Sequence, residues 1–412
     1  MNRLLGVPGF ARLWVAAFFG ETAEWMLQVA LPVYVFQRTG SAATTALSIV
    51  LGLLPAVLLS PVAGVVADRW NRRAVLFGVC VGLAVVALPL VAEPGVSVVY
   101  AVMAAQAALA SVFEPARNAL VPELVGVADV TAANGLMSVN GSVARLAGGW
   151  AGGALLGFGG LADVMIGYLA VLAVAAALLA KPFRRVAAPA ASPAREPVVR
   201  AWLDGLRELT RNRRLRRTGL ALVFTSLAQG MFLVLFVVYV LDVLGGSEAD
   251  AGLLRGVQAI GGLVAGFAVA TVARRVAPAA LLGWGSVVLG LLSAVIWNLS
   301  LVTTALGLYA GLFALAGAPG VVVGAGVLSE IQSAVAPERA GRVLSTTFAA
   351  VATCTTAGAL LAGALVATTG PAVLLNVQAG VYVLAGVLML LPRRGWTRQP
   401  VWRYRAAPSL KS

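Results

Sequence analysis

Two glutamates and a glutamine interrupt a long apolar stretch near the start of the chain. Glu21, Glu24 and Gln28 are spaced by three and then four residues, so a helix would place them on one face. If the stretch crosses a bilayer, Glu24 lies roughly 18 Å along the helix from Arg12, near the middle of a hydrocarbon core about 30 Å thick. An ionisable side chain there costs several kcal/mol and is a candidate functional group. Trp25 lies beside this polar stripe.

A second deep ionisable residue, Arg145, follows Ser138 and Ser142 at helical spacing. Burial favours the neutral form of a carboxylate, whereas a nearby arginine favours the ionised form. A carboxylate between these influences can take up and release a proton as its access to water changes. The sequence has no histidine, so proton chemistry would rest on carboxylates. We therefore predict proton or substrate coupling for Glu21, Glu24, Gln28 and Arg145; the alternative is a permanent structural ion pair.

Membrane-spanning helices are the elements that would position these residues. The 412 residues are 60% hydrophobic and 11% charged, whereas soluble domains are about 25% charged. A span needs about 20 predominantly apolar residues. Twelve stretches qualify: 12–36, 43–67, 74–92, 96–118, 131–157, 160–180, 218–242, 250–272, 279–297, 302–327, 343–369 and 371–391.

The basic residues give the chain a net charge of +14, which could indicate a nucleic-acid partner. Most of them, however, lie in short loops between apolar stretches, and cytoplasmic loops are enriched in Lys and Arg. We therefore predict the lipid bilayer and not nucleic acid as the partner, with both termini in the cytoplasm. The composition, rich in Arg, Ala, Val and Gly, favours a bacterial inner-membrane protein.

The chain also repeats itself weakly. At a shift of 205 residues, Val33-Tyr34-Val35 aligns with Val238-Tyr239-Val240, and Arg69 aligns with Arg274. Two parallel halves related by an axis along the membrane normal are one transporter plan. The predicted organisation is a first six-helix half (1–181), a linker with a membrane-surface amphipathic helix (182–217), a second six-helix half (218–392) and a basic tail (393–412).

A charged turn separates the second and third stretches. It reads Gly64-Val-Val-Ala-Asp68-Arg69-Trp-Asn-Arg72-Arg73. Glycine allows close helix approach, and the arginines hold the turn on the cytoplasmic side. The turn resembles the signature Gly-x-x-x-Asp-Arg-x-x-Arg-Arg between helices 2 and 3 of the major facilitator superfamily. A basic loop in another polytopic protein is the alternative. The corresponding second turn, Ala273-Arg274-Arg275, lacks the acid.

The resemblance implies an all-α membrane protein with twelve transmembrane helices in two pseudo-symmetric six-helix halves, and it extends to residue 395. Segments such as Phe10-Ala-Arg-Leu-Trp14 and Pro115-Ala-Arg-Asn-Ala-Leu-Val-Pro122-Glu123 are similar to the subgroup of macrolide-efflux and enterobactin-export proteins. Gly148, Gly149, Gly152 and Gly153 are similar to an antiporter signature of the fifth helix, Gly-x-x-x-Gly-Pro-x-x-Gly-Gly. Ala144 and Gly149 depart from it, and ordinary helix packing is the alternative.

The family plan also implies roles for other residues. Helices 1 and 5 are neighbours there, so Arg145 is expected to pair with Glu24 or Glu21. Cavity positions are expected at Trp25, Gln106 and Gln229, although Met103 stands where drug–proton antiporters commonly carry an arginine. A cytoplasmic gate is expected from Gly64, Asp68, Arg69, Arg72, Arg73, Glu114, Arg274, Arg275 and Glu330. In that gate Glu114 would bond the first arginine turn, and Glu330 would bond Arg274 or Arg275; simple surface ion pairs are the alternative.

The predicted function is secondary active export of an amphipathic small molecule, such as a drug, an antibiotic or a siderophore-like compound. Alternating access in exchange for protons would drive it, with the proton gradient as energy source and no cofactor or metal. The chain has no Gly-x-x-x-x-Gly-Lys loop, metal-ligand cluster or nucleophile triad, so we expect no enzyme. An uncoupled facilitator or lipid translocator, and a non-transporting scaffold or sensor, are the alternatives. A monomer is expected, since the family cavity forms within one chain.

Overall fold

The computed structural model describes residues 2–126, 129–183, 207, 210–272, 276–335 and 337–391. Every regular element in these residues is helical. In chain order the elements are α1 (Asn2–Leu5), α2 (Pro8–Thr39), α3 (Ala42–Arg69), α4 (Arg72–Ala87), η1 (Leu88–Ala92), α5 (Val96–Val125), α6 (Val130–Ala180), α8 (Arg213–Val238), η3 (Tyr239–Val243), α9 (Glu248–Val272), α10 (Pro278–Asn298), η5 (Leu299–Leu301), α11 (Leu306–Ala334), α12 (Pro337–Thr369) and α13 (Pro371–Leu390).

Each of the twelve predicted spans coincides with a long helix, and α6 supplies two of them. The backbone of α6 leaves the helical conformation at Gly159 and at Gly160, where φ is 73°. Glycine adopts that left-handed region without a steric penalty. Nine helices in the described residues are long and apolar enough to cross a membrane. The first span, α2, is not among them, because Glu21 and Glu24 lower its hydropathy.

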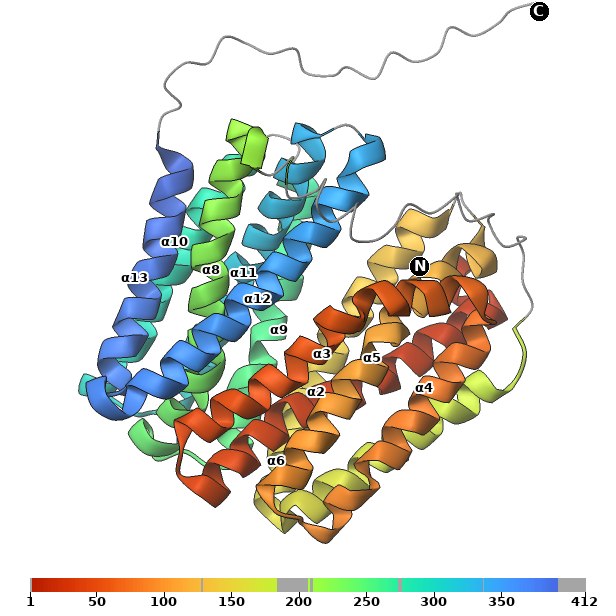
Figure 1. Cartoon of the computed structure of the whole chain (residues 1–412), viewed down its shortest axis with the longest axis horizontal. Coiled ribbons are helices and arrows are strands. Elements are labelled where there is room, and N and C mark those ends of the chain that lie inside the picture. Colours follow the sequence, from red (N-terminus) through yellow and green to blue (C-terminus); the bar gives the residue numbers. More distant parts are fainter. Residues whose placement is uncertain are drawn as a thin grey trace, which may run out of the picture.

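The helices form two bundles, α2–α6 and α8–α13 (Figure 1). In the first bundle α2 packs on α6, α3 on α5, and α4 on α6; in the second, α8 packs on α12, α9 on α11, and α10 on α13. These are the same pairs at corresponding positions of each half. The predicted fold class is therefore confirmed. The predicted linker helix and basic tail lie largely outside the described residues.

The two halves meet through α6 with α9 and through α3 with α12. We call the end of the molecule with the turns at Gly40 and Gly370 the closed end, and the opposite end, with the turn at Trp70, the open end. The ribbons of the halves meet at the closed end and lie apart at the open end (Figure 1). At the closed end the Gln37 amide donates a hydrogen bond to Glu248 of the other half.

An aromatic cluster packs inside the second half near the closed end, where α8 and α10 end and α11 begins. The Tyr239 hydroxyl lies 3.1 Å from that of Tyr309, and the Trp297 ring packs edge-on at 4.9 Å from Tyr239. The Trp297 Nε1 donates to Gln378 at 3.0 Å. Buried Tyr and Trp side chains need such partners for their polar atoms. This cluster fixes Trp297 and Gln378 at the edge of a central cavity.

Candidate functional site

Four glycines of α6 bring that helix unusually close to two neighbours at once. A Cβ at Gly152 would lie 2.9 Å from the Met26 Cα of α2, and a Cβ at Gly148 would lie 2.8 Å from the Trp25 Cβ. Both contacts are within the first half. Without a Cβ the backbones approach at van der Waals distance, as small residues allow in membrane helices.

The other two glycines face the second half. A Cβ at Gly153 would lie 2.7 Å from the Gly252 Cα, and a Cβ at Gly149 would lie 3.3 Å from the Gly256 Cα, both in α9. We call this contact the glycine seam. The predicted glycine face thus has two stripes about 100° apart on the helix: one packs within a half, and the other forms the seam between halves.

A central cavity of about 400 Å³ lies next to the glycine seam. Most of its wall belongs to the second half, and α2 and α6 add Trp25 and Arg145. Gln229, predicted for the cavity, lines it and accepts a hydrogen bond from the Tyr382 hydroxyl at 3.0 Å. A volume in this range suits a small organic ligand.

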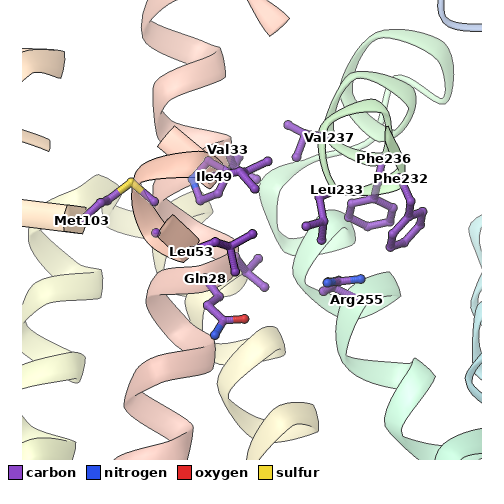
Figure 2. Close-up of a pocket in the computed structure, with 13 residues that line it drawn as sticks. Gln28, Val33, Ile49, Leu53, Met103, Phe232, Leu233, Phe236, Val237 and Arg255 are labelled. Atoms are coloured by element: carbon purple, nitrogen blue, oxygen red, sulfur yellow. The ribbon is translucent and has the colours of Figure 1, made fainter. Parts of the chain in front are cut away.

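A second, apolar hollow of about 110 Å³ adjoins the cavity between the halves. Figure 2 shows Val33 and Leu53 on one side of it and Phe232 and Phe236 on the other. Phe232 and Arg255 line both spaces, and Arg255 reaches into the hollow beneath the Phe232 ring (Figure 2). The combined site is therefore polar on one side and apolar on the other.

The Trp25 ring has a guanidinium group from each half beside it. The Cζ atom of Arg145 lies 4.8 Å from the ring centroid, and that of Arg255 lies 5.9 Å from it. Arg255 also lies 5.1 Å from the Phe232 centroid. Aromatic faces attract such cations. The sequence drew attention to Trp25 and Arg145, whereas Arg255 was not among the predicted site residues.

The prediction that Arg145 pairs with Glu21 or Glu24 is wrong in this conformation. Its Nη2 instead donates to the Gln258 Oε1 of α9 at 2.9 Å. The reason is helix rotation, because Arg145 precedes Gly149 by four residues and so continues the stripe that faces α9. Arg145 consequently contacts the opposite half.

Glu21 pairs with Arg117 of α5, and Arg117 also donates to the Glu114 carboxylate at 2.8 Å. The Arg117 side chain is only 9% exposed. The gate prediction for Glu114 is therefore wrong, since its partner is Arg117 and not an arginine of the turn. Arg117 was not among the predicted site residues; its position three residues after Glu114 is the signal that could have identified the pair.

Glu24 is exposed, and its carboxylate accepts a hydrogen bond from the Gln28 Nε2 at 2.9 Å. Gln28 lines the apolar hollow. Gln106 lines neither space: its amide donates to Leu83 O of α4 at 2.8 Å and accepts from the Tyr168 hydroxyl of α6 at 2.9 Å. The prediction that Gln106 lines the cavity is wrong, because these hydrogen bonds hold its side chain inside the first half.

The arginines of the first turn bind their own half. Arg72 pairs with the buried Glu123 at the end of α5 and donates to Ala119 O at 2.9 Å. Arg73 donates to Leu179 O at 2.9 Å, at the end of α6. These bonds tie the beginning of α4 to two neighbouring helix ends. The surroundings of Gly64 and the side chains of Asp68 and Arg69 lie outside the described part of the structure.

Glu330 is fully buried in α11, and its carboxylate accepts two hydrogen bonds from Arg214 of α8, at 2.6 and 2.8 Å. The expected partners Arg274 and Arg275 lie outside the described residues. The pair α8–α11 corresponds to α2–α5 in the first half. In the first half the acid, Glu21, is on the first helix and the arginine, Arg117, is on the fourth. In the second half the arginine is on the first helix and the acid is on the fourth, so the two charges exchange places between the halves.

Comparison with known proteins identifies the class that this arrangement represents. The profile of the Major Facilitator Superfamily matches residues 13–354. The multidrug efflux pump Tap of Mycobacterium tuberculosis is 31% identical over 307 residues, 70% of this chain and 71% of Tap. Macrolide efflux protein A of Streptococcus pyogenes is 30% identical over 69 residues, 17% of either chain. The uncharacterized transporter YfiS of Bacillus subtilis is 26% identical over 149 residues, 36% of either chain.

The fold agrees with these alignments. The crystal structure of the nucleoside transporter NupG superposes with a TM-score of 0.74 over 92% of this chain and 98% of NupG, at 13% identity. Two like halves of membrane helices around a central site are a common plan of secondary transporters. The chain belongs to the Major Facilitator Superfamily, whose members are transporters and not enzymes.

Proposed function

We propose that this transporter exports an amphipathic small molecule, of a drug, antibiotic or siderophore-like kind, in exchange for protons. Alternating access would use the proton gradient and no cofactor. Export is supported by two relatives, Tap and macrolide efflux protein A, which are both named as efflux proteins. The two-part site supports an amphipathic substrate, because its apolar hollow adjoins a polar cavity. We further propose that one chain is the working unit, a monomer in a bacterial inner membrane.

The observation that carries the proton step is the surroundings of Glu24. Glu21 has a cationic partner in Arg117, whereas the only polar partner of Glu24 among the described residues is the neutral Gln28. No ion pair has to break when Glu24 changes its protonation state. Carboxylates within membrane helices mark proton relays in pumps and transporters, and of Glu21 and Glu24 the second is the one without an ionic partner among the described residues.

The distribution of charge supports the orientation. Arg72 and Arg73 begin α4 after the open-end turn at Trp70, whereas Glu93 follows η1 and Glu248 begins α9 at the closed end. Cytoplasmic loops are enriched in basic residues. We infer that the open end and both termini face the cytoplasm, so this arrangement is inward-facing.

Glu24→Gln should abolish proton-driven export without unfolding the protein, because the amide keeps the size of the side chain but cannot release a proton. Accumulation of a panel of dyes and antibiotics would be measured in cells, with and without a proton uncoupler. Glu93→Gln is the matched control, since Glu93 pairs with Arg38 at an exposed site. Both the uncoupler and Glu24→Gln should raise accumulation to the level of cells that lack the protein.

Export that persists in the presence of the uncoupler would instead support an uncoupled facilitator or a lipid translocator, and Glu24 would then be structural. The absence of any flux across the panel, from vesicles as from cells, would favour a non-transporting role.

A cross-link across the closed end should stop transport. Cysteines at Gln37 and Glu248, which contact each other from opposite halves, would be joined by a short bismaleimide after replacement of Cys80 and Cys354 by serine. Alternating access requires this end to open, so the cross-linked protein should be inactive and recover when a cleavable linker is cut. The control pair, cysteines at Arg38 and Glu93, lies within the first half and should leave transport unchanged. Equal activity of both cross-linked proteins would contradict this mechanism.

A further inference from the structure

The central cavity holds two arginines and no acid. Arg145 and Arg255 line it, and no Asp or Glu is among its lining residues in the described chain. Arginines within a membrane protein normally pair with carboxylates, because an uncompensated charge is costly there. Among the described residues, Arg255 has the Trp25 and Phe232 rings beside it and no hydrogen-bond or ion-pair partner, and Arg145 has Trp25 and the neutral Gln258 as its partners.

Most of the hydrogen-bonding capacity of these arginines is unused. A guanidinium group carries five N–H donors and no acceptor. Of the donors of Arg145, Nη2 reaches Gln258, whereas the buried Nε has no partner among the described residues. Leaving buried donors unsatisfied costs free energy that a ligand with acceptor atoms can recover. The cavity is therefore short of acceptors and of negative charge.

The acids of the transporter lie elsewhere. Glu21 and Glu114 are bound to Arg117 between α2 and α5, and Glu24 contacts Gln28. These acids therefore have their partners within the first half, and none of them lines the central cavity. An anion in the cavity would meet two guanidinium groups without facing a carboxylate.

We propose that the cavity binds the carboxylate of an amphipathic organic anion, held between Arg145 of the first half and Arg255 of the second. Planar guanidinium groups match a carboxylate through paired hydrogen bonds. The apolar part of the same molecule occupies the adjoining hollow beside Phe232 and Phe236. This assignment rests on the proposed function and narrows its substrate to acidic amphiphiles.

The position of the site links the anion to alternating access. Arg145 lies four residues from Gly149, and Arg255 adjoins Gly256, so the anion is bound about one helical turn from the glycine seam. Its two ligands belong to different halves. Separation of α6 from α9 at the seam therefore pulls the two arginines apart and releases the anion.

Binding to purified full-length protein in nanodiscs tests the proposal without any proton gradient. Three probes share one aromatic body and differ in charge: 1-naphthylacetate, 1-naphthylacetamide and 1-naphthylmethylammonium. Their affinities would be measured by calorimetry. The anion should bind at least about tenfold more tightly than the amide, which is ~1.4 kcal/mol, and the cation should bind most weakly.

Arg255→Gln and Arg145→Gln should each remove the preference for the anion, whereas Arg38→Gln at the exposed closed end should not. Equal binding of the three probes, preference for the cation, or no binding of the anion would overturn the proposal. The wild-type comparison alone decides this, so a variant that fails to fold does not obscure the result. A proton-independent transporter would still show the anion preference, so the two proposals fail separately.

Discussion

A leucine at Gly153 should abolish transport by a protein that still folds, whereas a leucine at Gly152 should prevent stable folding. The two positions are adjacent, but Gly153 faces Gly252 across the glycine seam and Gly152 faces Met26 within the first half. The halves can separate at the seam to make room for a side chain. The packing of α2 on α6 has no such freedom, and overpacking there displaces backbone.

Size-exclusion profiles in mild detergent and export assays together distinguish these outcomes. Gly153→Leu should elute at the same volume as the wild type. Its leucine should prevent α6 and α9 from closing at the seam, so that the transport cycle is interrupted and export is lost. Gly152→Leu should aggregate or be degraded. Wild-type export by Gly153→Leu would show that the seam does not close tightly during transport.

Removal of the buried carboxylate of Glu330 should cost about 3–5 kcal/mol of stability, because it leaves the Arg214 charge without that partner. Glu330→Ala would be compared with wild type by thermal unfolding in detergent. Glu93→Ala is the control, since the exposed Arg38–Glu93 pair should contribute at most about 1 kcal/mol.

The double variant Arg214→Met/Glu330→Leu separates loss of the pair from creation of an unpaired charge. Replacement of a buried ion pair by apolar side chains is often neutral or stabilising. The double variant should therefore unfold closer to wild type than Glu330→Ala does. A double variant as unstable as the single one would show that the pair itself holds α8 to α11.

The number and order of the helices could be predicted from the sequence because each span is long, apolar and bounded by charge. The repeat at 205 residues indicated the two halves, since Tyr34 and Tyr239 mark corresponding positions. These features depend on composition along the chain. They do not depend on how each helix is rotated about its own axis.

Rotation is what could not be predicted. The adjacent glycines of α6 form two stripes, and composition does not tell which stripe faces α2 and which faces α9. This ambiguity caused the wrong partner for Arg145. The prediction for Gln106 failed for a similar reason. A polar side chain in an apolar helix can donate a hydrogen bond to the carbonyl of a neighbouring helix instead of facing the cavity, and Gln106 donates to Leu83 O.

Ion-pair partners were also hard to predict across helices. Glu114 was expected to reach the arginine turn, but Arg117 is on its own helix and one turn away. Short separations along one helix predict contacts reliably. The partner of Glu21 lies 96 residues further along the chain, and only the packing of α2 near α5 brings the two together.

The glycine seam also bears on how the chain is made. The first half leaves the ribosome before α9 is synthesised. Because domains generally fold in the order of their synthesis, the first half folds without α9. The face of α6 that carries Gly149 and Gly153 then borders lipid until α9 is inserted. At Gly149 and Gly153 this face exposes no polar side chain, and the backbone groups are satisfied within the helix, so these two positions border lipid at little cost. Arg145, one turn before Gly149 on the same face, is the part that needs α9, where Gln258 accepts its hydrogen bond. The glycine part of this interface therefore allows the first half to fold in the membrane before the second half is translated.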